Sequence, residues 1–239
     1  MGRFILFFAL FFVCAQARAA QKTVYFNTAD GCRLEAFYLA PSSGSYVFIN
    51  AHGLGSDKNE WGPFQQKLKT SGYGYLSLDL RGHGNSKTCG GKEVKYMFFS
   101  EAGWNAVSLD IETAAAWLKR KGISPRKMVF CGASVGANLA LKAAAEGSLK
   151  PAALVLLSPG LAYAGVQTEK YFTAPRHFRV LSIAARSDAY AWESVMRLNR
   201  AAMGQGLPAY SLEADGGHGV NMFKTPSVIP AILAWLEGK

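Results

Sequence analysis

The sequence has 239 residues, half of them hydrophobic, and a formal net charge of +10. This length and composition allow one sizeable buried core, and one domain is the natural expectation for an α/β chain of this size. No basic run is interleaved with aromatic residues, so the positive net charge does not indicate a nucleic-acid-binding protein.

The N-terminus has the pattern of an export signal. Arg3 is followed by an unbroken apolar run over residues 4–13, and residues 15–17 and 17–19 both fit a small-x-small cleavage site. The apolar run is about half the length of a membrane span, which needs about 20 residues. We therefore expect a cleaved signal peptide over residues 1–19 and a single mature domain over residues 20–239. The competing interpretation is a buried N-terminal helix.

Strands and helices alternate along the mature chain. Apolar runs predict strands at residues 23–27, 33–39, 46–51, 74–80, 127–131, 153–157, 179–184 and 209–212. Apolar residues at helical spacing predict helices at residues 58–70, 104–118, 135–146, 192–203 and 226–237. Because most strands are continuously apolar rather than alternating, they predict a mostly parallel sheet with helices on both faces.

Removal of residues 1–19 leaves three cysteines, Cys32, Cys89 and Cys131. An exported protein favours disulfides, but three cysteines cannot all pair within one chain. Cys131 lies in the apolar run at residues 127–131 and is expected to be a buried free thiol. Cys32 and Cys89 are then the candidates for a bridge.

A serine stands at the corner between the strand at 127–131 and the helix at 135–146. Gly132, Ala133 and Gly136 surround Ser134 with small residues, as a one-residue strand-to-helix turn requires. Such a turn lifts the hydroxyl clear of the sheet, and the N–H of Val135 at the start of the helix favours a developing oxyanion. Ser134 is therefore the candidate nucleophile.

A serine nucleophile needs a base, and only two histidines follow Ser134 in the chain. His177 precedes the strand at 179–184 and should lie at the sheet edge opposite Ser134. His218 follows the last strand and should lie at the same edge as Ser134. We assign His218 as the general base.

The acid that orients this histidine is expected to be Asp188, which directly follows the strand at 179–184. Asp215 is too close to His218 in sequence, and Glu169 and Glu193 lie in less favourable segments. A helix begins soon after Asp188, so a helix N-cap is the competing role, and the two roles can coexist.

With these residues in place, the chain resembles the α/β-hydrolase superfamily over its mature length. It is most similar to the branch of small esterases, monoacylglycerol lipases and serine-aminopeptidase-like enzymes. Residues 52–56 (HGLGS) resemble the oxyanion loop of the family, which implies that the N–H of Leu54 joins that of Val135. Residues 79–86 (DLRGHGNS) match a turn that is mainly structural in the family, so His52 and His83 are not expected to act as bases.

The resemblance also implies an eight-stranded sheet of order 1-2-4-3-5-6-7-8 with strand 2 reversed. That order places Cys32 beside the loop holding Cys89, and we predict a Cys32–Cys89 disulfide. Family members commonly carry a helical lid, whereas only residues 160–178 are available for one here. The resemblance therefore implies a minimal lid and an open pocket.

Six apolar residues are candidates for the pocket wall, although an aromatic residue near a helix is more often part of a core. They are Trp61, Phe64, Phe98, Phe99, Tyr190 and Met222.

These observations together predict an exported serine hydrolase that cleaves a small carboxylic ester through an acyl-enzyme. Its partner is a small-molecule ester, and the chemistry needs no metal or organic cofactor. A peptidase or an acyltransferase would use the same triad of Ser134, Asp188 and His218. A non-catalytic binding protein on the same scaffold is the alternative from another class.

Overall fold

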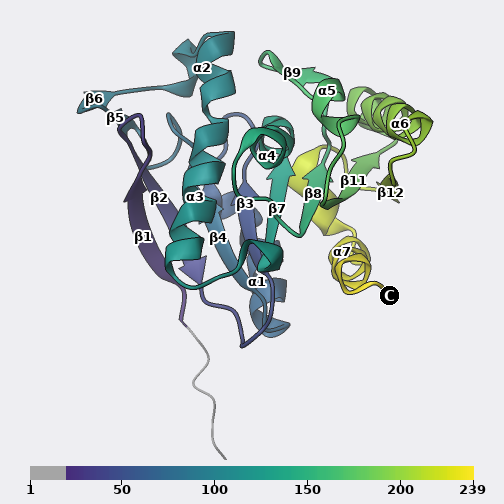
Figure 1. Ribbon diagram of the computed structural model, residues 1–239, viewed down its shortest axis with the longest axis horizontal. Coiled ribbons are helices and arrows are strands. Elements are labelled where there is room, and N and C mark those ends of the chain that lie inside the picture. The colour runs from purple at the N-terminus through teal and green to yellow at the C-terminus, as the bar shows by residue number, and fades with distance from the viewer. Residues whose placement is uncertain (1–19) are drawn as a thin grey trace, which may run out of the picture.

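A ten-stranded mixed sheet organises residues 20–239, the part of the chain that this computed structural model describes (Figure 1). The predicted signal peptide, residues 1–19, lies outside the described residues. The long strands are β1 (Lys22–Asn27), β2 (Cys32–Leu39), β3 (Val47–Ala51), β4 (Gly74–Leu78), β7 (Met128–Ala133), β8 (Ala153–Leu157), β11 (Arg179–Ala185) and β12 (Tyr210–Ala214). Their order in the sheet, from β1 to β12, is β1-β2-β4-β3-β7-β8-β11-β12.

This is the strand order that the family resemblance implied, and the α/β fold is confirmed. Strands β4, β3, β7, β8, β11 and β12, in this sheet order, pair in parallel. Strand β2 pairs antiparallel with both β1 and β4. Two strands of this sheet were not predicted. β5 (Thr88–Cys89) and β6 (Lys92–Glu93) have two residues each and continue the sheet beyond the end of β4, along the same edge of β2.

Helices cover both faces of the sheet. The α-helices are α1 (Gly62–Thr70), α2 (Glu101–Ala106), α3 (Ser108–Arg120), α4 (Val135–Glu146), α5 (Glu169–Phe172), α6 (Ala189–Gly204) and α7 (Val228–Glu237). Short 3-10 helices are η1 (Lys58–Trp61), η2 (Tyr96–Phe98), η3 (Pro125–Lys127) and η4 (Gly219–Lys224). The single helix expected over residues 104–118 is divided at Val107 into α2 and α3.

The two faces bury separate apolar clusters. Helices α3, α4 and α6 contribute to one cluster, and α1 and α7 contribute to the other. On β3, Val47 and Ile49 face the first cluster and Phe48 between them faces the second. Because both faces of the strand are buried, its sequence does not alternate between apolar and polar residues, and its one polar residue, Asn50, is buried and donates to the Ser77 hydroxyl at 2.9 Å. None of the described helices is long and apolar enough to cross a membrane.

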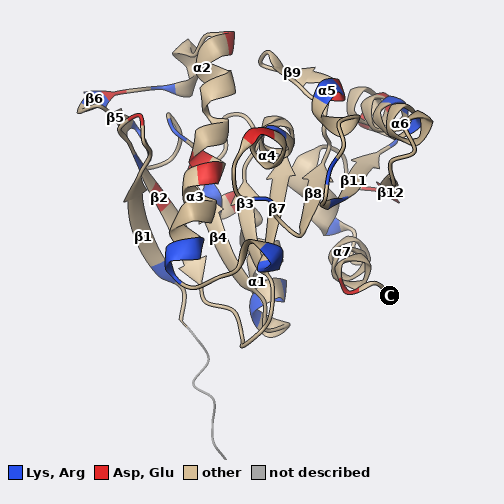
Figure 2. Cartoon of the chain, in the orientation of Figure 1, with Lys and Arg blue, Asp and Glu red and all other residues tan. Residues whose placement is uncertain are grey.

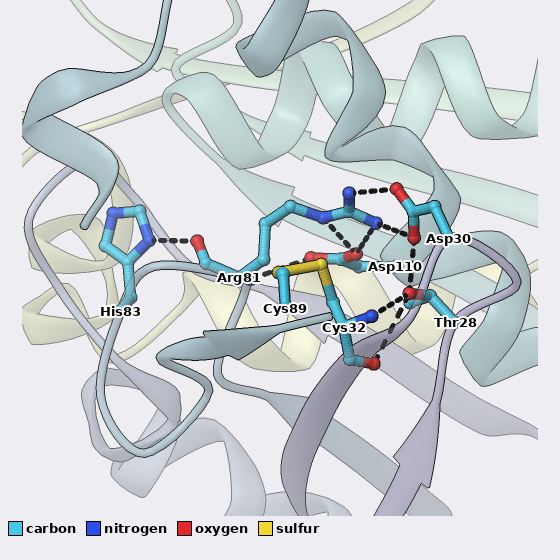
Figure 3. The surroundings of a disulfide bond; sticks show 7 residues. All are labelled: Thr28, Asp30, Cys32, Arg81, His83, Cys89 and Asp110. Carbon is cyan, nitrogen blue, oxygen red and sulfur yellow. Dashed lines mark hydrogen bonds and ion pairs between the residues drawn. A yellow bond between two sulfur atoms is a disulfide. The ribbon is translucent and has the colours of Figure 1, made fainter. Parts of the chain in front are cut away.

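The disulfide predicted between Cys32 and Cys89 is present and joins β2 to β5 (Figure 3). Beside it, the Arg81 side chain pairs with the exposed turn residue Asp30 and with Asp110, which is fully buried on α3. The third cysteine, Cys131, is a buried free thiol on β7. The disulfide and the ion pairs together fasten the β1–β2 turn to the loop that follows β4.

Lys and Arg positions are distributed along many helices and loops of the chain in Figure 2 rather than gathered in one segment. Two of the cations, Lys58 and Arg81, are buried and paired with carboxylates. The charges of these two residues are therefore neutralised inside the protein and do not add to its surface charge.

Candidate active site

Ser134 is the single residue between β7 and α4, and its backbone is strained. Its φ is 55° and its ψ is −124°, a conformation that costs a non-glycine residue about 1–3 kcal/mol. The turn is possible only because the positions two residues before and two residues after Ser134 are glycines. A Cβ on Gly132 would lie 2.2 Å from the carbonyl oxygen of Gly136, and one on Gly136 would lie 2.2 Å from that of Ala51.

The loop after β3 lies against Ser134. A Cβ placed on Gly53 would lie 3.6 Å from the Cβ of Ser134. The N–H of Val135, at the first position of α4, has no partner within its own helix, as is general for helix N-termini. The loop and the helix start therefore flank the serine from two sides.

His52 orients the peptide group that joins Gly53 to Leu54. Burial, followed by the charge of nearby His83, lowers the pKa of His52 to about 3, so the ring is neutral at pH 7. Its Nε2 accepts the Leu80 N–H at 3.0 Å, which leaves the proton on Nδ1 to be donated to the Gly53 carbonyl at 2.8 Å. In a trans peptide the N–H points away from the carbonyl, so the Leu54 N–H is directed to the opposite side. Within residues 20–239 that N–H has no hydrogen-bond acceptor.

His218 and Asp188 are in direct contact. The Nδ1 of His218 lies 2.6 Å from Oδ2 of Asp188. Asp188 stands at the N-cap position of α6, but its side chain does not cap the helix and accepts from His218 instead. The His218 side chain is 45% exposed and that of Asp188 is 13% exposed, so the histidine is reachable from solvent while its acid is covered.

The loop that carries His218 is fastened beside the serine turn. The Gly219 N–H donates to the hydroxyl of Ser158 at 2.9 Å, and a Cβ on Gly219 would lie 3.5 Å from that of Ala133. Ser158 follows β8 with a φ of 49° and has no sequence motif that would have revealed it.

Ser134, Asp188 and His218 follow β7, β11 and β12, which run parallel, so all three lie at one edge of the sheet. In the described part of the chain no hydrogen bond joins the Ser134 hydroxyl to His218. Catalytic hydrogen bonds are often long in unliganded enzymes and tighten when substrate binds. His177 is exposed and precedes β11, at the opposite edge.

The short insert that replaces a lid packs beside His218. It consists of the hairpin β9 (Ala162–Tyr163) and β10 (Val166–Gln167), followed by α5. The buried amide of Asn138 on α4 fixes it, accepting from the Gly160 N–H and donating to the Val166 carbonyl. The Tyr163 ring lies 6.1 Å from the His218 ring, edge to face. The insert therefore borders the site on one side.

Three of the proposed wall residues are not at the surface. Trp61, Phe64 and Met222 are fully buried in the apolar cluster between the sheet and helices α1 and α7. Phe98 and Tyr190 are exposed, by 79% and 45%. These three side chains belong to the core, which is where large apolar residues are most often found.

Comparisons with known proteins give a family match and many matches of fold. Residues 44–194 match the family model described as "Serine aminopeptidase, S33". No curated protein sequence matches the chain. The solved structures that it resembles include the Pyrococcus furiosus esterase Pf2001, with a TM-score of 0.73 and 19% identity over 91% of this chain and 92% of that one.

Two further solved structures are named for different activities. An acetyl xylan esterase from Paenibacillus sp. R4 has a TM-score of 0.71 and 17% identity, over 94% of this chain and 85% of that one. The Porphyromonas gingivalis dipeptidyl peptidase 4 has a TM-score of 0.70 and 14% identity, over 93% of this chain and 36% of that one. At these identities the likeness concerns the fold.

Proposed function

Because the chain belongs to the serine aminopeptidase (S33) family of α/β-hydrolases, we propose that this hydrolase cleaves small carboxylic esters through an acyl-enzyme formed on Ser134. The observation that carries the proposal is the 2.6 Å contact between His218 Nδ1 and Asp188, at the sheet edge where Ser134 is held in its strained turn. An acid that is largely covered from solvent and fixes the tautomer of an accessible histidine is what a general base next to a serine requires.

In the first half of the reaction, Ser134 Oγ bonds to the ester carbonyl carbon while its proton passes to Nε2 of His218. The charge on the former carbonyl oxygen is then stabilised by the N–H groups of Leu54 and Val135. Asp188 stabilises the imidazolium without taking its proton. The proton goes to the alcohol oxygen as the carbon–oxygen bond breaks, which leaves the acyl group on Ser134.

In the second half, water gives a proton to His218 and attacks the acyl carbon. The bond to Ser134 breaks and the serine oxygen regains a proton from the histidine. The same two N–H groups stabilise this second tetrahedral intermediate. The balance of the reaction is one ester and one water converted to an acid and an alcohol, so no oxidant, reductant or further co-reactant is consumed.

An ester is the favoured substrate because the insert over residues 160–178 is short and leaves His218 accessible. A peptidase or an acyltransferase would use the same groups and differ in the acceptor. A panel of p-nitrophenyl esters, thioesters and aminoacyl amides separates these activities by their relative kcat/KM.

The test is the turnover of p-nitrophenyl acetate by the wild type and by Ser134→Ala. We expect the variant to lose at least about 10³-fold in kcat with an unchanged melting temperature. A variant that keeps wild-type turnover would show that the chemistry does not use this serine. A protein that turns over no member of the panel would instead support a binding scaffold.

We also propose that the protein is exported. The signal pattern at residues 1–19 and the Cys32–Cys89 disulfide support this location, since disulfides persist in oxidising compartments. N-terminal sequencing of the protein purified from its native host tests the proposal, with a mature N-terminus near residue 20 expected.

A further inference from the structure

We infer that Glu60 is a positioning residue of the oxyanion hole, holding the loop that presents the Leu54 N–H to the reacting carbonyl. This inference rests on the proposed function and adds to it a residue outside the triad. Glu60 lies in η1, seven residues after the glycine that it contacts, and its Oε1 accepts the Gly53 N–H at 3.0 Å.

The contact is important because Gly53 has no side chain to restrain it. The peptide group that precedes its Cα is held by Glu60, and the peptide group that follows is held by His52 through the Gly53 carbonyl. Glycine otherwise rotates freely about φ and ψ, so these two contacts together determine where the Leu54 N–H points. The Leu54 side chain is 59% exposed and provides little anchorage of its own.

Glu60 is itself rigidly placed. Trp61, the next residue, is completely buried in the core, and Lys58, two residues earlier, is buried in an ion cluster. The carboxylate of Asp79 accepts from both the backbone N–H and the Nζ of Lys58, at 2.8 and 2.7 Å, and Glu35 pairs with the same Nζ at 2.9 Å. Because Asp79 begins the turn at residues 79–86, that turn supports the oxyanion loop through η1.

The position of Glu60 is close to the reacting groups. Its Oε2 lies 3.9 Å from the point where a Gly53 Cβ would stand, and that point is 3.6 Å from the Cβ of Ser134. Burial raises the pKa of Glu60, opposed by the Ser56 side chain and the Gly53 N–H. A carboxyl group kept in so unfavourable a place is expected to have a specific task, and accepting the Gly53 N–H is the one that the contacts show.

Two variants separate the hydrogen-bond acceptor from the charge. Glu60→Gln keeps an oxygen within reach of Gly53 and removes the charge. Glu60→Asp keeps the charge and withdraws the oxygen by one carbon–carbon bond, about 1.5 Å. Asn59→Ala, at an exposed position of the same 3-10 helix, is the matched control.

We expect Glu60→Asp to lower kcat for p-nitrophenyl acetate about 10- to 100-fold with little change in KM, because displaced oxyanion donors cost rate rather than ground-state binding. Affinity for a trifluoromethyl ketone, which forms a tetrahedral adduct, should fall by the same factor. Glu60→Gln should stay within about threefold of wild type and Asn59→Ala within about twofold, since the donors remain in place. Hydrogen exchange of residues 52–56 should accelerate in Glu60→Asp alone.

Three outcomes would overturn the inference. Glu60→Asp could retain wild-type kcat and ketone affinity, Glu60→Gln could lose as much as Glu60→Asp, or exchange of the loop could be unchanged in folded Glu60→Asp. The Ser134→Ala variant distinguishes failure of the Glu60 inference from failure of the proposed function. If Ser134→Ala keeps its turnover, the proposed function fails and the role of Glu60 fails with it. If only the Glu60 variants disagree, the triad stands and the positioning role does not.

Discussion

Loss of the Cys32–Cys89 disulfide should destabilise the protein by about 4 kcal/mol. The two cysteines are 57 residues apart in the chain, and a cross-link closing a loop of that length lowers the entropy of the unfolded chain by about 14 cal/mol/K. At 25 °C this corresponds to about 4 kcal/mol of unfolding free energy. The bond also fastens β5 beside the Arg81–Asp30 ion pair, so the native state should loosen locally when it is absent.

The assay is urea unfolding of the mature protein and of the Cys32→Ser/Cys89→Ser double variant, followed by tryptophan fluorescence. The midpoint should fall by more than about 1 M urea in the variant. Wild type in reductant should approach the variant, and the variant should not respond to reductant. In urea without reductant, wild type should show one reactive thiol, Cys131. Three reactive thiols in the wild type would show that the disulfide is absent, and unfolding free energies that agree within about 1 kcal/mol would show that it does not stabilise the protein.

Three further changes have outcomes that the structure predicts. Gly136→Ala places a Cβ 2.2 Å from the backbone oxygen of Ala51, so the soluble yield and the melting temperature should fall sharply. The control, Gly204→Ala, meets no atom within 4 Å and should leave both unchanged. An unaffected Gly136→Ala variant would contradict the tight turn. Burial lowers the pKa of His52 from 6.5 to about 3. Between these pH values the unfolded state binds a proton at His52 and the folded state does not, so the free energy of unfolding should decline as the pH falls from 6.5 toward 3. His52→Asn, which keeps a donor near the position of Nδ1, should flatten that decline in urea titrations at several pH values, and equal slopes would argue against a buried neutral ring. Asp188→Asn should lower kcat by about 10³- to 10⁴-fold with a normal melting temperature, because the amide no longer selects the required imidazole tautomer; a loss below tenfold would remove Asp188 from the mechanism.

Much of the fold follows from local patterns in the sequence. The helix Val135–Glu146 and the strand Ala153–Leu157 have the predicted boundaries, because one starts at a glycine-flanked corner and the other is a short, purely apolar run. The strands β5 and β6 were not predicted, since a strand of two residues is too short to show a periodic pattern. They exist because the β2 edge and the disulfide hold them in place.

The candidate site was predictable where chain order and strand direction determine position. Ser134, Asp188 and His218 each follow a parallel strand, so the sheet places them at one edge whatever their intervening loops do. Glu60 could not be found in this way, because its role depends on a loop that folds back onto a 3-10 helix. The sequence also did not show which aromatic residues belong to the core. Trp61 stands in a polar segment and is fully buried, whereas Phe98 stands in a run of apolar residues and is 79% exposed.

Covalent labelling with a fluorophosphonate, followed by peptide mapping of the adduct, tests directly whether Ser134 is the nucleophile. Wild-type protein should carry one phosphonyl group, on Ser134, and His218→Ala should react far more slowly although its serine is intact. Failure of the wild type to react, or an adduct on a residue other than Ser134, would contradict the account.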